Sequence, residues 1–220
     1  MVDIISKEEL ERAFDSRFPA ETKAKLADAR VAVAGLGGLG SNIAVMLARS
    51  GVGHLFLVDF DVVDVTNLNR QAYSASHIGK PKTEAIKDII AEINPYLDVE
   101  VCCKTVDENN AEELFGSYDI VCEAFDRAEN KSMLISFLLS ACPEMRIVSG
   151  NGMAGYGNCN DIQTKKIFER LYVCGDGKSG IEGGIGLMAP RVAVCAGHQA
   201  DKVIELILGD VSAAADNFSD

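Results

Sequence analysis

The sequence lacks the features that would place it in or across a membrane. A helix that crosses a bilayer needs about 20 consecutive apolar residues, and no run in the 220-residue chain approaches that length. The first residues, MVDIISKEEL, are acidic and amphipathic, without the basic start and apolar stretch of a signal peptide. We therefore expect a cytoplasmic protein that makes no membrane contact.

Patterns for structural metal binding and for covalent catalysis are also missing. The three histidines are isolated from one another, and the seven cysteines form no Cys-x-x-Cys pair. This usage matches neither a zinc ribbon nor a disulfide framework, so we expect no structural zinc and reduced, mostly buried thiols. No Ser/His/Asp or paired-acid arrangement stands out either.

Positive charge is scarce. Lys and Arg number 21 against 33 Asp and Glu, which gives a formal net charge of −12. Because phosphate neutralisation dominates nucleic-acid affinity, such a chain is poorly suited to hold a polyanion over a broad surface. Nucleic acid is therefore an unlikely partner, whereas the length and the 48% apolar content suit one globular α/β domain.

Apolar strand-like runs alternate with amphipathic helical segments after an N-terminal helical arm at 1–29. Residues 30–220 are expected to form a single domain. The expected strands are 30–35, 54–60, 98–106, 118–125 and a fifth that begins at 146. The expected helices are 39–51, 82–95, 110–116, 128–142 and 190–209. This order predicts an α/β fold with a Rossmann-like, doubly wound, mostly parallel sheet, whose ligand site lies at the carboxyl ends of the strands.

A glycine-rich turn follows the first expected strand. Gly35, Gly37 and Gly40 match G-x-G-x-x-G in VAVAGLGGLGS, and Gly38 lies within the same turn. The first glycine permits a tight turn, the second lets a phosphate approach the backbone, and the third lets the helix pack on the strand. With the helix N-terminus behind it, the turn predicts a nucleotide-phosphate site.

The stretch after the second strand decides between two nucleotides. Asp59 lies about 20 residues after the glycines, where an acid binds ribose hydroxyls, and Asp61 follows it. So far NAD and ATP fit equally. A dehydrogenase has no evident need for the Asn-x-x-Arg-Gln cluster that comes next, whereas a triphosphate does. Arg70 offers a planar fork and Lys82 a point charge for phosphates. The remaining polar candidates in this cluster are Asn67 and Asn69, which fix the loop or touch phosphate and ribose.

Asp126 follows the fourth strand and faces the same crevice. Mg²⁺ typically takes one or two carboxylates together with substrate oxygens, so Asp126 is the expected magnesium ligand. Its second expected role is to cap the helix that begins near Arg127.

The set GLGGLGS, VDFDVVDVTNLNRQ, IGKPK, INP and FDRAENK, in this order, closely resembles the ThiF/MoeB/HesA family of the ubiquitin-activating-enzyme superfamily. The similarity covers about residues 15–155 and the closing helix. It implies an ATP- and Mg²⁺-dependent adenylyltransferase that acts on the C-terminal Gly-Gly carboxylate of a small ubiquitin-like sulfur carrier. It also implies a homodimer in which an N-terminal arginine completes the partner's site, with Arg17 the best match and Arg12 the second.

The chain departs from the family pattern in lacking the two zinc-binding Cys-x-x-Cys pairs and in being short between 156 and 189. This brevity most resembles the ThiF variants that serve the thiamine carrier ThiS, which implies a role in thiamine thiazole synthesis. Cys174 is expected to lie inside a polar, glycine-rich and mobile stretch, of which the segment 175–186 is expected to close over the carrier's tail. An idle thiol is the favoured interpretation of Cys174, and capture of the activated carrier is the alternative.

Three other functions stay open at this point. A tRNA threonylcarbamoyladenosine dehydratase is a sister branch of the same superfamily, although the net charge opposes tRNA binding. An NAD(P)-dependent oxidoreductase explains the glycines and Asp59 but gives no role to Arg70, Lys82 or Asp126. A non-catalytic scaffold is disfavoured because no essential residue is missing.

Overall fold

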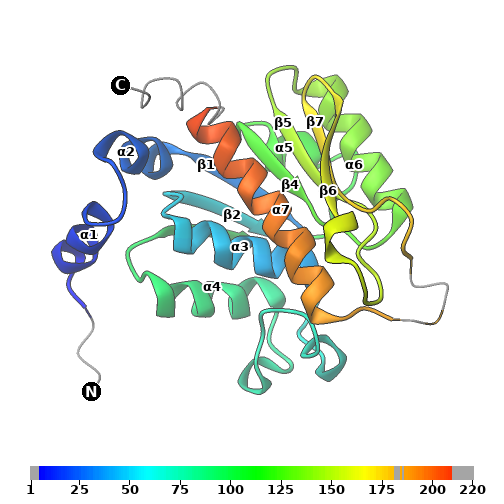
Figure 1. The fold of residues 1–220 in the computed structure, drawn as a ribbon, viewed down its shortest axis with the longest axis horizontal. Helices are drawn as coiled ribbons and strands as arrows, with labels where there is room; N and C mark the ends of the chain where they lie inside the picture. The colour runs from blue at the N-terminus through cyan, green and yellow to red at the C-terminus, as the bar shows by residue number, and fades with distance from the viewer. Residues whose placement is uncertain (1–4, 181–183, 185, 210–220) are drawn as a thin grey trace.

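A seven-stranded sheet forms the centre of the molecule (Figure 1). The computed structural model describes residues 5–180, 184 and 186–209. The sheet has the order β3-β2-β1-β4-β5-β7-β6, and every neighbouring pair is parallel except β6 with β7. The strands are β1 (Arg30–Ala34), β2 (His54–Val58), β3 (Asp98–Cys102), β4 (Ile120–Glu123), β5 (Arg146–Gly150), β6 (Gln163–Phe168) and β7 (Leu171–Gly175).

Helices cover both faces of this sheet. In Figure 1, α3, α4 and α7 lie in front of the strands and α5 and α6 lie behind them. The helices are α1 (Lys7–Asp15), α2 (Ala20–Asp28), α3 (Gly38–Ser50), α4 (Lys82–Ile93), α5 (Ala111–Phe115), α6 (Ala128–Ala141) and α7 (Ala189–Leu208). The predicted doubly wound, mostly parallel α/β fold is confirmed.

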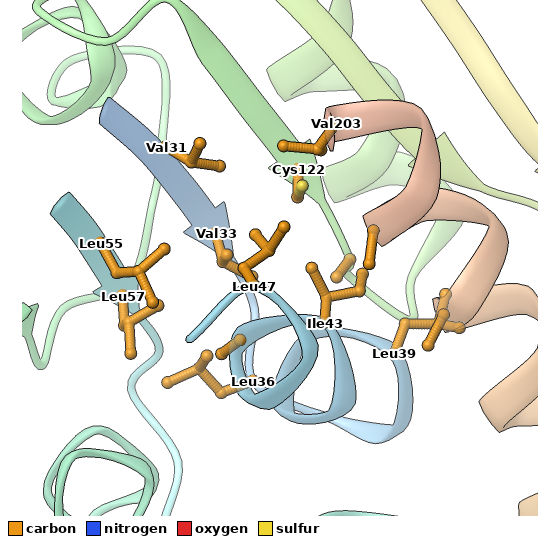
Figure 2. Close-up of a cluster of buried hydrophobic side chains, with 14 of the residues drawn as sticks. Val31, Val33, Leu36, Leu39, Ile43, Leu47, Leu55, Leu57, Cys122 and Val203 are labelled. Atoms are coloured by element: carbon orange, nitrogen blue, oxygen red, sulfur yellow. The ribbon is translucent and has the colours of Figure 1, made fainter. Parts of the chain in front are cut away.

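The two layers of helices enclose two apolar cores. The central strands read as continuous apolar runs because both of their faces are buried, as is usual in parallel sheets. On one face, Leu39, Ile43 and Leu47 of α3 point toward β1, β4 and Val203 of α7 (Figure 2). Phe115 lies in the core on the opposite face. Each such side chain stabilises the fold by about 1.5–3 kcal/mol on burial.

The strand order reverses between β1 and β4. From β1 the chain proceeds outward to β2 and β3, then returns to place β4 on the other side of β1. In doubly wound sheets the crevice at the carboxyl ends of these strands is where ligands bind. The glycine turn after β1 and the segment containing Asp126 after β4 flank this point.

The structure adds detail to the expected secondary structure in two places. The arm consists of two helices, α1 and α2, and Pro19 occupies the N-cap position of α2. The region around 163–175, for which no strand was predicted, forms the antiparallel hairpin of β6 and β7. No helix in the described ranges combines the length and apolar character required to cross a membrane.

Candidate active site

The glycine turn between β1 and α3 is shaped by its lack of side chains. Gly35 has a φ of +91°, a left-handed conformation that favours glycine. A Cβ on Gly40 would lie 1.8 Å from the carbonyl oxygen of Gly35, so any side chain there would push α3 off the strand. Gly37, by contrast, has open space around its Cα. The tight turn at Gly35 and the close packing at Gly40 therefore require glycine, and the approach of a phosphate at Gly37 stays a prediction.

A buried lysine and two aspartates lie beside this turn. Lys82, the first residue of α4, is 6% exposed. Its Nζ lies 2.8 Å from Oδ2 of Asp61 and 4.0 Å from Oδ2 of Asp59. Asp59 also accepts a hydrogen bond of 2.6 Å from the backbone N–H of Leu36. The acid after β2 is thus fixed directly against the glycine turn, with one ammonium group shared between the two carboxylates.

Tyr73 joins the same group from the loop between β2 and α4. Its hydroxyl donates to the carbonyl oxygen of Leu36 at 2.9 Å, and it lies 3.5 Å from the carbonyl oxygen of Lys82. Burial raises the pKa of Tyr73, and the carboxylates of Asp59 and Asp61 raise it further. The hydroxyl therefore stays protonated and holds the turn and the start of α4 together.

Arg70 lies over the first turn of α3. The position that a Cβ on Gly38 would occupy is 3.6 Å from both Cγ and Nε of Arg70. Nη1 donates to the carbonyl oxygen of Thr66 at 3.1 Å and to Oδ1 of Asn69 at 2.8 Å. Nε is buried and has no hydrogen-bond partner in the part of the chain that the structure describes. A buried donor of this kind indicates that an acceptor, such as a ligand oxygen, is missing.

The two asparagines act on the loop itself. Oδ1 of Asn67 accepts from the backbone N–H of Asp64 at 2.9 Å and completes a capping box. Nδ2 of Asn69 donates to the carbonyl oxygen of Leu187 at 3.0 Å, while its oxygen accepts from Arg70. Of the two roles expected for these asparagines, the structure shows the one that fixes the loop and orients Arg70.

Asp126 lies in the connection between β4 and α6, with its side chain exposed. The expectation that it caps α6 is wrong, because the N-cap residue is Arg127 and no side chain caps this helix. No hydrogen bond or salt bridge of Asp126 occurs among the described residues, which leaves the carboxylate available for a ligand.

These residues fit a nucleotide-bound Mg²⁺ but not a cation cage made of protein alone. Within the described ranges no group of three or more His, Cys, Asp or Glu is placed to hold a metal. Mg²⁺ needs only one or two carboxylates when phosphates supply further oxygens. Asp126, at the carboxyl end of β4, meets that requirement.

The N-terminal arginines are not brought to this site within one chain. Arg17 is exposed in the connection between α1 and α2, and Arg12 is exposed on α1. The arm joins the body at the amino ends of the strands, where the N–H of Gly53 donates to the carbonyl oxygen of Leu26 at 2.8 Å. The glycine turn lies at the opposite ends of these strands.

Cys174 does not lie in a polar loop, as expected, but within β7. It is 0% exposed, and burial raises its pKa to about 11 against the effect of a hydrogen bond from Thr164. Because the thiolate is the nucleophile, this environment favours the idle thiol over the covalent role.

The segment after β7 is anchored where it begins. Nη2 of Arg191, in the first turn of α7, lies 2.6 Å from Oδ2 of Asp176, and both side chains are largely buried. Oδ1 of Asp176 accepts from the N–H groups of Lys178 and Ser179 at 2.8 Å each. The predicted mobility of 175–186 falls partly on 181–183 and 185, which lie outside the described residues.

Replacing Cys174 by alanine should leave carrier adenylation within about twofold of the wild-type rate, because the thiol is protonated and enclosed. The measurement is single-turnover AMP transfer followed by mass spectrometry, with Cys103→Ala at the exposed cysteine as the matched control. A loss confined to Cys174→Ala, in a variant with an unchanged melting temperature, would establish a chemical role for the thiol.

Two residues beside the site were missed in the sequence. Tyr73 gave no signal, since a tyrosine in a polar loop has no fixed direction. Glu123 did give one: it is a charged residue inside the apolar run YDIVCEAF, and it is 0% exposed at the end of β4. A buried carboxylate at the carboxyl end of a strand is therefore a candidate site residue, as the acids in the loops are.

The site combines a glycine turn where the strand order reverses, an acid after β2, and cations around both. This combination defines a nucleotide-binding protein with a Rossmann-like fold. The chain belongs to the ThiF family, whose family model matches residues 10–219. The predicted family is therefore confirmed, and with it the predicted class of enzyme, an ATP-dependent adenylyltransferase.

Two sequence relatives and one solved structure illustrate the similarity. Molybdopterin-synthase adenylyltransferase of Salmonella typhimurium is 32% identical over 197 residues, which cover 86% of this chain and 77% of the relative. The tRNA threonylcarbamoyladenosine dehydratase of Haemophilus influenzae is 34% identical over 148 residues, 66% of this chain and 56% of the relative. The fold matches the E. coli dehydratase TcdA, solved with ATP, with a TM-score of 0.83 and 23% identity, covering 96% of this chain and 99% of that one.

Proposed function

We propose that this chain transfers AMP from ATP to the C-terminal glycine carboxylate of a small ubiquitin-like sulfur-carrier protein. The observation that carries the proposal is the pair of cations around the glycine turn. Buried Lys82 lies between two carboxylates, and Nε of Arg70 has no partner among the described residues. In this proposal residues 30–220 act as one adenylation domain and residues 1–29 as an arm. A cytoplasmic location remains part of the proposal.

The reaction needs no general base. A carboxylate is ionised at neutral pH, so one of its oxygens attacks the α-phosphorus directly as the bond to the β-phosphate oxygen breaks. The electron pair of that bond leaves with pyrophosphate, and a mixed anhydride of the carrier with AMP remains. Catalysis therefore rests on positioning and on neutralising charge where two anions meet.

The residues around the turn can supply both requirements. Backbone N–H groups of the turn, at the N-terminus of α3, would bind the phosphates of a bound nucleotide. Mg²⁺, when bound, would neutralise phosphate charge and be held by Asp126. The remaining proposed roles are ribose binding by Asp59, orientation of Lys82 by Asp61, phosphate contact by Arg70 and Lys82, and completion of a homodimeric partner's site by Arg17 or Arg12.

The identity of the carrier is the finer part of the proposal. The short region between 156 and 189 favours a ThiS-like carrier and hence thiamine thiazole synthesis. Relatives that cover most of the chain are named for molybdopterin synthase, which makes a molybdopterin-type carrier the direct competitor.

A tRNA substrate is the second candidate, because a relative named for that activity is 34% identical over 148 residues. The net charge of −12 opposes it, since tRNA binding depends on neutralised phosphates. Salt-dependent binding of tRNA at physiological ionic strength would favour this candidate over a protein carrier.

The test is incubation with ATP, Mg²⁺ and each of the two carrier types, each ending in Gly-Gly. Intact mass spectrometry should find one carrier heavier by one AMP, with release of pyrophosphate. A carrier lacking its last glycine is the control. Absence of AMP transfer to either carrier, together with tRNA-stimulated ATP turnover, would overturn the proposal.

A further inference from the structure

Glu123 places a carboxyl group inside the protein at the edge of the site. It is the last residue of β4 and is 0% exposed. The two strands beside it, β1 and β5, end instead in Ala34 and Gly150, which carry no charge. A buried carboxylate is costly unless it is paired and hydrogen-bonded, so its contacts show what it does.

Both oxygens of this carboxylate are engaged. Oε2 accepts from Oγ of Ser149 and from Nζ of Lys131, each at 2.6 Å. Oε1 accepts from the backbone N–H of Phe125 at 2.8 Å. One side chain thereby connects the ends of β4 and β5, the first turns of α6 and the backbone next to Asp126.

The segment held in this way also contacts the glycine turn. The N–H of Ala124 donates to the carbonyl oxygen of Ala34 at 2.8 Å. A Cβ on Gly35 would lie 3.0 Å from both the carbonyl oxygen of Ala124 and Cδ1 of Phe125. Residues 124 and 125 are therefore confined between the turn and the carboxylate, and Asp126 is the first residue beyond them.

We propose that Glu123 is a positioning residue that fixes the direction of Asp126 toward the nucleotide, with Ser149 and Lys131 holding its carboxylate in place. This inference rests on the proposed function. Stability alone does not account for a carboxyl group at this position, because a buried ion pair adds little stability compared with apolar residues of similar volume. Misplacement of a reacting or binding group by about 1 Å can lower a reaction rate by about 10²-fold. Fixing this backbone avoids such a misplacement of Asp126.

Binding of a non-hydrolysable ATP analogue tests the proposal without turnover. Calorimetry gives the dissociation constant of the analogue once with Mg²⁺ and once with EDTA. The ratio of the EDTA value to the Mg²⁺ value is the increase in affinity due to the metal, called the metal gain below. Asp126→Asn should abolish the gain. Glu123→Gln should lower it about tenfold. Glutamine has a single acceptor oxygen, so when that oxygen accepts from the ammonium of Lys131, its NH₂ group faces the backbone N–H of Phe125, donor against donor. Ser149→Ala, which removes one of the three contacts, should lower it by a smaller factor.

Arg170 provides the matched control at the other end of α6. Its guanidinium donates to three backbone carbonyl oxygens, those of Leu139, Cys142 and Met145. Arg170→Met should lower the melting temperature and leave the metal gain unchanged, which separates loss of stability from loss of position.

The outcomes distinguish this inference from the proposed function. Loss of the gain in Asp126→Asn together with a wild-type gain in Glu123→Gln overturns the inference alone. A wild-type protein that binds the analogue equally in Mg²⁺ and EDTA overturns the metal role of Asp126 in the proposed function and the inference with it. If Glu123→Gln does not fold, Ser149→Ala decides: a reduced gain supports positioning, and an unchanged gain overturns it.

Discussion

Lys82→Ala is expected to lower ATP–pyrophosphate exchange by about 10²-fold or more. The substitution removes the ammonium shared by Asp59 and Asp61 and leaves two carboxylates facing an incoming triphosphate. Repulsion should therefore weaken ATP binding, and the lost charge should slow the chemical step. The measurement is exchange of labelled pyrophosphate at saturating carrier, over a range of ATP concentrations.

Lys80→Ala is the matched control, two residues away. Lys80 pairs with Asp88 at 2.7 Å on the surface, and both side chains are about half exposed. Such pairs contribute about 0–1 kcal/mol, so exchange should stay close to the wild-type rate. Equal exchange rates for the two lysine variants would contradict the proposed phosphate role of Lys82, and a lower melting temperature of Lys82→Ala in that case would assign Lys82 to the fold.

Arg70→Ala is expected to lower the exchange rate to a similar extent, about 10²-fold. Its Nε is a buried donor without a partner in the described chain, and a phosphate oxygen would satisfy it. Arg70→Lys should recover only part of the rate, because an ammonium cannot reproduce the planar fork of a guanidinium. Exchange of labelled pyrophosphate under the same conditions measures the effect.

Arg70→Gln separates charge from packing. The stem of Arg70 lies over Gly38, so truncation to alanine also removes apolar contact, whereas glutamine keeps most of the stem. A rate for Arg70→Gln as low as that for Arg70→Ala supports phosphate contact. Arg49→Ala, at an exposed position in the last turn of α3, should match the wild type, and a wild-type rate in Arg70→Gln would count against the proposal.

The periodic parts of the fold could be predicted from sequence, because each predicted strand and helix carries its own burial pattern. β1 and β2 read as apolar runs, and α3 ends where Gly51 takes a left-handed conformation with φ +86°. The hairpin of β6 and β7 escaped prediction because β6 is an edge strand whose Lys165, Lys166 and Phe168 are exposed. No alternation of apolar and polar residues marks such a strand.

Some residues of the candidate site could also be predicted from the sequence, and others could not. Gly35, Asp59 and Lys82 were predictable because each lies directly after a strand or at the start of a helix, where the topology brings them together. The hydroxyl bridge from Tyr73 to Leu36 was not, because it depends on how the loop between β2 and α4 folds back. Cys174 was misplaced because its strand was not predicted.

The ion pair between Asp176 and Arg191 has a consequence for how the protein can change over evolution. It joins Asp176, directly after β7, to Arg191 in the first turn of α7. Doubling the length of a flexible loop costs only about 0.6 kcal/mol in closure entropy. A change in the number of residues between these two anchors would therefore cost little and would leave the nucleotide crevice in place.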